Sequence, residues 1–512
     1  MDAENRFNLI DEPWIPIVDV GQVSLRQLFS HPEYRALGGN PVQKIALTKL
    51  ILAIAQAAYT PVDDDDWSIL QPSGLAEKSL GYLELWHDRF YLYGEKPFLQ
   101  MPILDLLIKD EKPKSFGSGF YPDVLTDNNT ILTQSQVERK LSDAEKAIFI
   151  ITLMNLAFGG KRIHKNIPAL TSNYQGKTVS AKSAPSLGNY VGYLHSFLIG
   201  DSIQETIWLN LFTLEKIQNT KIWVNELGKS PWEEMPSGEN CEIAKRLKNS
   251  YMGCLLAMSR FVLLKDDGLF YIEGLQYPSH KDGWFEPSIS LNQDGATVKA
   301  LWLDVEKKPW RELTALLSFL TAVDQQGFDC HQIRIGFQRV KHREKSIGIW
   351  SGGLKVRGNS GDQSVKQDDD FIESYIVLPA PNSITGEDSG WFNTLSLEMS
   401  LIEDLAMKLG NCVYHCNKRM ITDSRERDKR SDALKKSAQN LFWQICEKKF
   451  QDLVIHANEA DKVARLRIRF ADFVHKAYDT HCPKETSRQL DAWAKNRPNL
   501  SNYLKNPTKE AA

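Results

Sequence analysis

Apolar residues recur with helical spacing through the last quarter of the chain. Steps that alternate between four and three residues place side chains on one side of a helix. The positions in this pattern are Leu395, Met399, Ile402, Ala406, Leu409, Val413 and Cys416, then Leu434, Ala438, Leu441 and Ile445, then Val463, Leu466, Phe470, Phe473 and Ala477, and finally Leu490, Trp493, Leu500 and Tyr503. Four successive amphipathic helices predict a C-terminal four-helix bundle over residues 387–512.

Two apolar stretches nearer the start also predict helices, at residues 41–59 and 142–157. Ser142 and Glu145 have the spacing of a capping box, in which each residue satisfies a backbone N–H of the other. Gly159-Gly160 follows the second stretch, and glycine commonly ends a helix because it accepts the left-handed conformation. The sequence therefore predicts a helix that begins after Ser142 and stops at these glycines.

Strand patterns are mixed with these helices. Residues 8–18 predict a strand interrupted by two prolines, and residues 89–101 predict a strand followed by a turn. A Pro, Asn, Ser and Gly-rich stretch at 379–390 precedes the helical region and is the predicted linker. The fold class is therefore predicted as α+β, with a large mixed α/β domain over residues 1–386 before the bundle.

Two segments, 159–190 and 351–370, are rich in Gly and Ser and lack periodicity, so they are predicted to be long loops, which are usually functional or disordered. Basic residues gather in or beside them. Residues 161–182 hold five Lys or Arg and no acidic residue, and residues 338–357 hold six against one Glu. A third basic cluster covers 408–449. Basic runs are commonly solvated faces, but glycine-rich backbone beside positive charge also suits phosphate contact.

Composition narrows the class of protein. A length of 512 residues with 42% hydrophobic residues predicts two or three globular domains. The net charge of −3 argues against nucleic-acid binding by the whole surface, so only local charge supports it. The start of the chain lacks a signal-peptide pattern, and no apolar run is long enough to cross a membrane. Seven scattered cysteines are typical of a reducing compartment, so we expect a cytoplasmic location.

No convincing catalytic constellation is evident. His87-Asp88 is typical of metal phosphohydrolases, but further ligands on neighbouring helices are not apparent. Cys412, His415 and Cys416 share a helix face, yet zinc would need a fourth ligand, such as Cys446 or His456. Buried cysteine is also an ordinary core residue. We therefore expect no metal, no cofactor and no enzyme activity, and a metal-dependent nuclease or a purely structural helical scaffold are the alternative hypotheses.

Five blocks carry a resemblance to a known family. They are NLIDEPWIPI at 8–17, GEKPFLQ at 94–100, LNLFTLE at 209–215, KKPWREL at 307–313 and SGGLKV at 351–356. The opening block is the most specific. In order and spacing they resemble CasA proteins, the large subunits of the type I-E CRISPR Cascade surveillance complex, and the resemblance covers nearly the whole chain.

The resemblance implies a function in antiviral defence. The chain would be a non-catalytic subunit with several partners, namely other Cascade subunits, CRISPR RNA, double-stranded target DNA and a helicase-nuclease. It would recognise a protospacer-adjacent motif (PAM) in the minor groove, open the duplex beside it, promote R-loop formation and provide a docking surface for the helicase-nuclease. Guide RNA pairing then reads the sequence, a division of labour known from another effector. The sequence leaves open whether the downstream partner is a nuclease or a transposition module.

The resemblance also implies site residues. Gly159 and Gly160, followed by Lys161 and Arg162, match the glycine loop that enters the minor groove. The predicted wedge loop runs from Gly352 to Gln363, with Gln363 or Asn359 as the wedge and Lys355 and Arg357 as phosphate contacts. Lys281 corresponds to a basic residue that reads the edge of a PAM base in some members. A segment near residues 128–137, with Asn128 and Gln134, matches the loop that contacts the RNA handle.

Overall fold

The computed structural model describes residues 4–108, 112–116, 140–158, 170, 192–266, 268–277, 280, 283–320, 327–356, 371–385, 390–421, 423 and 425–505. The chain divides into two compact units. Unit 1 comprises Met1–Trp310, Gln326–Arg339 and Gly348–Tyr375. Unit 2 comprises Arg311–Gln325, Val340–Ile347 and Ile376–Ala512. Independent folding of residues 387–512 stays a prediction.

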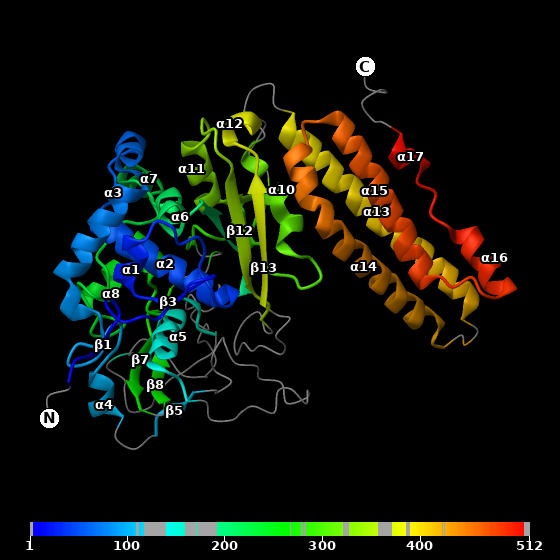
Figure 1. Ribbon diagram of the computed structural model, residues 1–512. Helices are drawn as coiled ribbons and strands as arrows, with labels where there is room; N and C mark the ends of the chain where they lie inside the picture. The colour runs from blue at the N-terminus through cyan, green and yellow to red at the C-terminus, as the bar shows by residue number, and fades with distance from the viewer. Residues whose placement is uncertain are drawn as a thin grey trace. The chain divides into compact units, whose positions relative to one another are not determined.

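Helices dominate both units (Figure 1). In unit 1 they are α1 (Leu25–Ser30), α2 (Pro41–Ala58), α3 (Asp64–Leu85), α4 (Ile103–Leu107), α5 (Asp143–Leu156), α6 (Ile203–Asn210), α7 (Leu214–Asn219), α8 (Glu242–Lys248), α9 (Tyr251–Leu255) and α11 (His331–Arg339). In unit 2 they are α10 (Leu313–Leu316), α12 (Pro381–Ile384), α13 (Trp391–Met420), α14 (Arg427–His456), α15 (Ala460–His481), α16 (Ser487–Asn496) and α17 (Ser501–Leu504).

The described strands are short and form several small sheets. They are β1 (Arg6–Asn8), β2 (Ile15–Ile17), β3 (Gly21–Val23), β4 (Tyr91–Tyr93), β5 (Lys114–Ser115), β6 (His195–Ile199), β7 (Arg260–Lys265), β8 (Gly268–Glu273), β9 (Ser290–Asn292), β10 (Lys299–Ala300), β11 (Phe328–Cys330), β12 (Ile347–Leu354) and β13 (Phe371–Leu378). The strand orders are β1-β4, β2-β3, β5-β8-β7, β10-β9-β11 and β13-β12-β6. The predicted α+β class is confirmed.

Helices α2 and α5 pack together in unit 1. Both begin at a capping box: Asn40 with Gln43 for α2, and Ser142 with Glu145 for α5. In the second box the Ser142 hydroxyl accepts from the Glu145 N–H at 3.3 Å, and the Glu145 carboxylate accepts from the Ser142 N–H at 2.9 Å. Nearly every side chain of α5 is buried, because apolar residues cover all its faces. Both predicted helices and the predicted box are confirmed.

The strand predicted over residues 8–18 is wrong as one element. Its ends belong to two different sheets, since β1 pairs with β4 while β2 pairs with β3. Between them the chain turns, and the Trp14 indole N–H donates to the Leu9 carbonyl at 2.8 Å. A buried ring with its polar atom satisfied stabilises this turn. The strand and turn predicted over 89–101 are confirmed by β4 and the turn after it.

The loop predicted from residue 351 begins later than expected. Residues up to Leu354 continue β12, which pairs with β6 in antiparallel register, so the first part of the prediction is wrong. The glycines serve packing within the sheet. A Cβ on Gly352 would lie 2.8 Å from the Trp350 ring, and a Cβ on Gly353 would lie 2.8 Å from the Tyr193 carbonyl. Residues 357–370, and nearly all of the other predicted loop at 159–190, lie outside the described residues.

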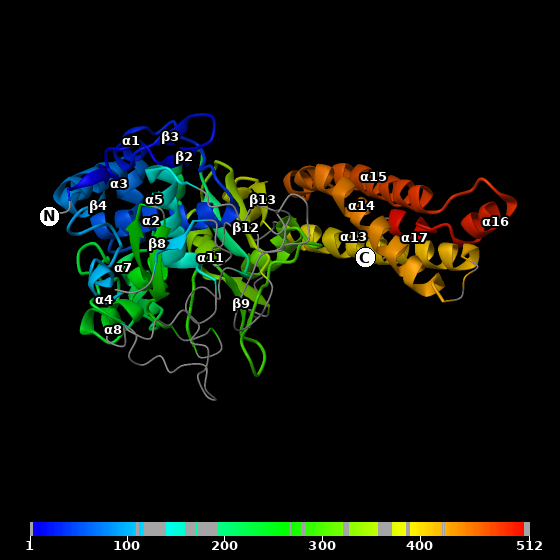
Figure 2. The ribbon, with the colours of Figure 1, turned by 90° about the horizontal axis from the view of Figure 1, so that it is seen from below.

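In unit 2 the long helices α13, α14 and α15 run side by side, and α16 packs on α13 (Figure 2). The apolar face predicted from Leu395 to Cys416 is buried throughout, so the bundle is confirmed. A buried ion pair crosses this core, where the Arg467 guanidinium donates from Nε to the Glu398 carboxylate at 2.9 and 3.0 Å. No helix in the described parts of the chain is both long and apolar enough to cross a membrane.

Three details of the predicted bundle faces differ. In α14 the buried side chains include Ala438, Phe442, Cys446 and Phe450, so the face is rotated by about one residue from the predicted one. In α15 Phe473 is only half-buried, and in α16 Leu490 is half-exposed. The apolar face of α14 was predicted from the spacing of its apolar residues, and the many lysines of this helix make that spacing less distinct.

Candidate nucleic-acid interface

Lys355 is the one predicted nucleic-acid contact that the described residues include. The others, Gly159, Gly160, Lys161, Arg162, Lys281, Arg357, Asn359 and Gln363 for DNA and Asn128 and Gln134 for the RNA handle, lie outside them. The structure does describe the residues on which these segments begin and end. Their contacts show how the points at which these segments leave and rejoin the described part of unit 1 are held.

Helix α5 connects the predicted RNA-handle segment to the predicted glycine loop. Phe116, the last described residue before that segment, is buried and packs edge-on against Phe149 of α5, with ring centroids 5.7 Å apart. The chain re-enters at residue 140, and α5 then runs from Asp143 to Leu156. One buried helix therefore lies between the two predicted recognition segments.

The end of α5 changes the interpretation of the glycines. Ala157 is the C-cap residue and has extended backbone, with φ −64° and ψ 144°. An extended C-cap requires no left-handed residue, so glycine is not needed to end this helix. The helix ends within one residue of the predicted boundary at 157, and its C-cap residue is Ala157 rather than a glycine. Gly159 and Gly160 themselves lie outside the described residues.

A buried arginine fixes the residue just before those glycines. Arg260, on β7, donates from Nη2 to the Phe158 carbonyl at 2.6 Å and from Nε to the Tyr271 hydroxyl at 2.8 Å. Its Nη1 forms an ion pair with Glu273 of β8, and these two side chains are 1% and 2% exposed. Buried charges persist only when they are paired and hydrogen-bonded. Removing either partner would leave an uncompensated charge beneath the start of the predicted glycine loop.

Two other predicted segments have their ends in contact. Gly192 is the first described residue after 171–191, and Val356 directly precedes Arg357. A Cβ on Gly192 would lie 2.7 Å from Val356 Cγ2 and 2.8 Å from the Trp302 ring, so only glycine fits. The Gly192 carbonyl accepts from the Leu303 N–H at 3.0 Å. Gly192, where the chain re-enters after the predicted glycine loop, is thus packed against Val356, the last described residue of the predicted wedge segment.

His280, the residue before Lys281, contacts the same group of residues. His280 is 8% exposed, and its Nδ1 lies 3.3 Å from the Tyr193 hydroxyl. The Tyr193 ring meets the His280 ring edge-on at 5.5 Å and the Trp302 ring at 4.3 Å. Gly192, Tyr193, His280, Trp302 and Val356 are named the Tyr193 cluster. Burial raises the pKa of Tyr193 to about 12, so its hydroxyl stays protonated at neutral pH.

Lys355 lies beside this cluster. Its ammonium donates to the Leu303 carbonyl at 3.1 Å, and the side chain is partly buried. An ammonium has three N–H donors, so this bond leaves capacity for a further acceptor such as a phosphate oxygen. The contact fixes the orientation of the side chain next to Val356.

Arg260, Glu273, Tyr193, Trp302 and His280 were not singled out from the sequence. One signal was present, because an arginine that begins the apolar run RFVLL requires a buried partner. The remaining contacts join residues that are far apart in the chain, which local patterns cannot indicate. They hold the ends of these segments at two buried places in unit 1, the Arg260–Glu273 pair and the Tyr193 cluster, and recognition loops are usually carried on such a packed scaffold.

The described residues offer little for catalysis. Across them, no group of three or more His, Cys, Asp or Glu side chains has the geometry to hold a metal ion. His87 Nε2 lies 2.6 Å from the Asp11 carboxylate, within a surface network that includes Arg26 and Glu84. Partial burial opposes the effect, but hydrogen bonds from His87 and Arg26 hold the pKa of Asp11 below its ordinary value. His87 therefore ties the opening block to the end of α3.

Two of the zinc ligands considered from the sequence lie in different surroundings. Cys416 is fully buried in the bundle, whereas His415 is exposed on the same helix, so the two do not face a common point. Cys446 is buried on α14, where burial raises the pKa of its thiol and so disfavours the thiolate that zinc requires. These cysteines are core residues within the bundle.

The fold, a mixed α+β unit followed by a bundle of long helices, is that of CasA proteins. CasA of Thermus thermophilus superposes with a TM-score of 0.71 at 20% identity, over 98% of this chain and 99% of that one. Cse1 of Thermobifida fusca superposes with a TM-score of 0.74 at 18% identity, over 98% of both chains.

Sequence comparison gives the family. The family model for CRISPR-associated protein Cse1 matches residues 8–480. The chain therefore belongs to the CRISPR-associated Cse1 family, also called CasA. A curated relative, CasA/Cse1 of Thermus thermophilus, is 30% identical over 241 residues, which span 44% of this chain and 43% of that protein. The predicted family is confirmed.

Proposed function

We propose that this chain is the non-catalytic large subunit of a type I-E CRISPR RNA-guided surveillance complex. In this function it recognises the PAM in double-stranded DNA, promotes duplex opening and R-loop formation, and offers a docking surface to a helicase-nuclease. Membership of the Cse1 family supports the assignment. A chain in a solved structure of a CRISPR RNA-guided surveillance complex has this fold, with a TM-score of 0.63 at 15% identity.

The observation that carries the DNA-recognition part is the packing of segment ends in unit 1. The Tyr193 cluster holds the residues that flank Lys281, the wedge segment and the return of the glycine loop. The buried Arg260–Glu273 pair holds the residue before Gly159. Reading a groove and separating the base pair beside it require protein segments at a fixed spacing, because base contacts are short-range. Segment ends that are held by buried contacts support that requirement.

The test is reconstitution with and without this chain. We expect a complex assembled on CRISPR RNA to bind and open PAM-bearing duplex only when the chain is present. The purified chain, incubated with plasmid and Mg²⁺ or Mn²⁺, is expected to leave the plasmid intact, whereas cleavage would favour the nuclease hypothesis. Equal binding of duplexes with and without a PAM would favour a structural scaffold.

A further inference from the structure

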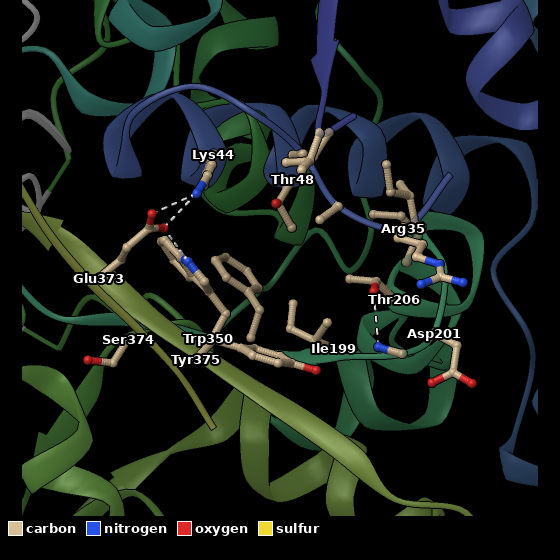
Figure 3. Close-up of a pocket in the computed structure, with 17 residues that line it drawn as sticks. Arg35, Lys44, Thr48, Ile199, Asp201, Thr206, Trp350, Glu373, Ser374 and Tyr375 are labelled. Atoms are coloured by element: carbon tan, nitrogen blue, oxygen red, sulfur yellow. Dashed lines mark hydrogen bonds and ion pairs between the residues drawn. The ribbon is translucent and has the colours of Figure 1, made fainter. Parts of the chain in front are cut away.

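A slot of about 700 Å³ lies in unit 1, away from the Tyr193 cluster. One wall is the face of the sheet formed by β6, β12 and β13, which contributes Phe197, Ile199, Trp350 and Tyr375. The opposite wall is α2 with the segment around Arg35 (Figure 3). The Trp350 and Phe197 rings lie 6.3 Å apart, and a Cβ on Gly348 would overlap the Tyr375 ring, so this glycine lets the tyrosine lie across the sheet.

Charged groups occupy the two ends of the slot (Figure 3). At one end the Lys44 ammonium pairs with the Glu373 carboxylate at 2.7 Å, and the Trp350 indole N–H donates to the same carboxylate at 2.6 Å. At the other end lie Arg35 and Asp201. Arg35 is exposed and has no hydrogen bond or ion pair with any other described residue. Its guanidinium is thus available to an acceptor from outside.

Strand β13 borders this slot and is an edge strand. Among the described strands it has one neighbour, β12, in the order β13-β12-β6. The Ile372 carbonyl points toward β12, since it lies 2.9 Å from a Cβ built on Gly352. Peptide groups alternate in direction along a strand, so those of Glu373 and Tyr375 face outward. Farther along the same edge the Val377 N–H donates to Gln451 Oε1 at 3.0 Å, and the Val377 carbonyl accepts from Gln451 Nε2 at 2.7 Å. The part of the edge left for pairing is therefore at Glu373 and Tyr375, and an exposed strand edge is a template for pairing with another extended chain.

We propose that the slot binds an extended segment of a partner protein, which pairs with the outer edge of β13 and presents a carboxylate to Arg35. Backbone pairing provides affinity in this mode of recognition, while side-chain pockets beside the edge provide specificity. Tyr375 is 55% exposed and Val18 is 48% exposed, and both line the slot, so an apolar side chain of the segment has a surface to cover.

The charges favour a peptide over nucleic acid. The carboxylates of Glu373 and Asp201 balance Lys44 and Arg35 within the slot. Phosphate binding instead depends on an excess of Lys and Arg. The partner segment is thus expected to alternate apolar and polar residues and to carry Asp or Glu near one end. This inference does not depend on the proposed function.

Selection of peptides on the full-length chain tests the proposal, with phage-displayed random linear peptides as the probe. Enriched peptides are expected to alternate apolar residues and to contain Asp or Glu. Arg35→Glu is expected to weaken their binding about tenfold, because an attractive charge pair becomes repulsive. Arg465→Glu, the same charge change at an exposed site on α15, is the matched control and should leave binding unchanged.

Two further measurements test the pairing itself. Methylating alternate backbone nitrogens of a selected peptide should abolish binding, and bound peptide should slow amide exchange at Glu373 and Tyr375 more than at Ile372 and Ser374, which face β12. Peptides that bind Arg35→Glu as tightly as they bind the parent chain would overturn the proposal. It would also be overturned if binding survived methylation of either alternate set of the peptide's backbone nitrogens. Oligothymidylate binding that depends on Arg35 would overturn it too, because the slot would then belong to nucleic acid.

Discussion

Arg260 donates a hydrogen bond to the Phe158 carbonyl at 2.6 Å, across 102 positions of sequence and with both groups buried. Phe158 is the last described residue before Gly159, so this bond fixes the point from which the predicted glycine loop departs. The guanidinium is itself held by Glu273 and Tyr271. The buried Arg260–Glu273 pair therefore both positions Phe158 and stabilises unit 1, and substitutions can separate these two effects.

Arg260→Met is expected to destabilise unit 1 by about 3–5 kcal/mol, since it leaves the Glu273 carboxylate buried without its partner. Adding Glu273→Leu removes that charge, and the double variant should recover most of the loss in thermal unfolding. Because Phe158 still lacks its donor, PAM-dependent binding by the assembled complex should stay weak. Full recovery of both properties would mean that Arg260 serves stability alone.

Replacing Gly160 with Leu is expected to reduce PAM-dependent DNA binding more than complex assembly, because a side chain would hold the backbone off the floor of a narrow groove. The helix before it ends at Leu156, so helix stability should not change. Gly295→Leu is the matched control, since a Cβ there meets no atom closer than 3.9 Å. Band shifts of the complex on duplexes with and without a PAM provide the measurement, and unimpaired binding by Gly160→Leu would contradict groove contact.

Deleting residues 359–363, which include Asn359 and Gln363, is expected to slow R-loop formation on closed duplex. Inserting a side chain between base pairs costs a few kcal/mol of unstacking, which targets already unpaired beside the PAM do not incur. Such pre-opened targets should largely be spared. A defect of equal size on both targets would show that this segment is another backbone contact rather than a wedge.

Lys355→Met and Arg357→Met are expected to behave differently from that deletion. As phosphate contacts, each should weaken binding to closed and pre-opened targets alike and lower the salt dependence of binding by about one unit of slope. Titrations over a range of salt concentrations measure this slope. An unchanged slope for Lys355→Met would indicate that its bond to the Leu303 carbonyl is its whole function.

Acid is expected to destabilise unit 1 through His331. Burial, with smaller contributions from Arg334 and Lys216, lowers the pKa of His331 to about 3 from 6.5, and Arg334 donates to its Nδ1 at 2.8 Å. The unfolded chain takes up this proton below about pH 6.5 and the folded chain does not, so stability is complete above that pH and falls toward pH 3, by roughly 5 kcal/mol. Chemical unfolding of His331→Gln and the parent between pH 7 and pH 4 should reveal a flatter profile for the variant.

Residues 387–512 expressed alone are expected to give a helical spectrum and one cooperative thermal transition, since the buried faces of α13, α14 and α15 contact one another within this range. Several contacts are lost in that fragment, among them the Arg311 guanidinium 3.6 Å above the Trp443 ring and the hydrogen bonds between Val377 and the Gln451 side chain. The fragment should therefore melt somewhat below the same helices in the full chain. A random-coil spectrum would reject the predicted boundary.

The parts of the fold predicted from sequence are those governed by local interactions. The capping box of Ser142 and Glu145 depends on residues three positions apart, and the buried face of α13 depends on a repeat within one helix. The face of α14 was misplaced because charged residues weaken its periodicity. The Tyr193 cluster could not be predicted, since Tyr193 and His280 are 87 positions apart and their contact depends on the whole fold.

The Tyr193 cluster has a consequence for how such proteins diversify. Segments that depart from one packed base can lengthen, shorten or change composition without altering the core, as long as Gly192 and Val356 keep their close contact. Under the proposed function, the recognised DNA motif could then change while the scaffold stays constant. Replacement of residues 357–370 of this chain should therefore alter recognition and leave the core intact, whereas a larger residue at Gly192 should disrupt the base itself.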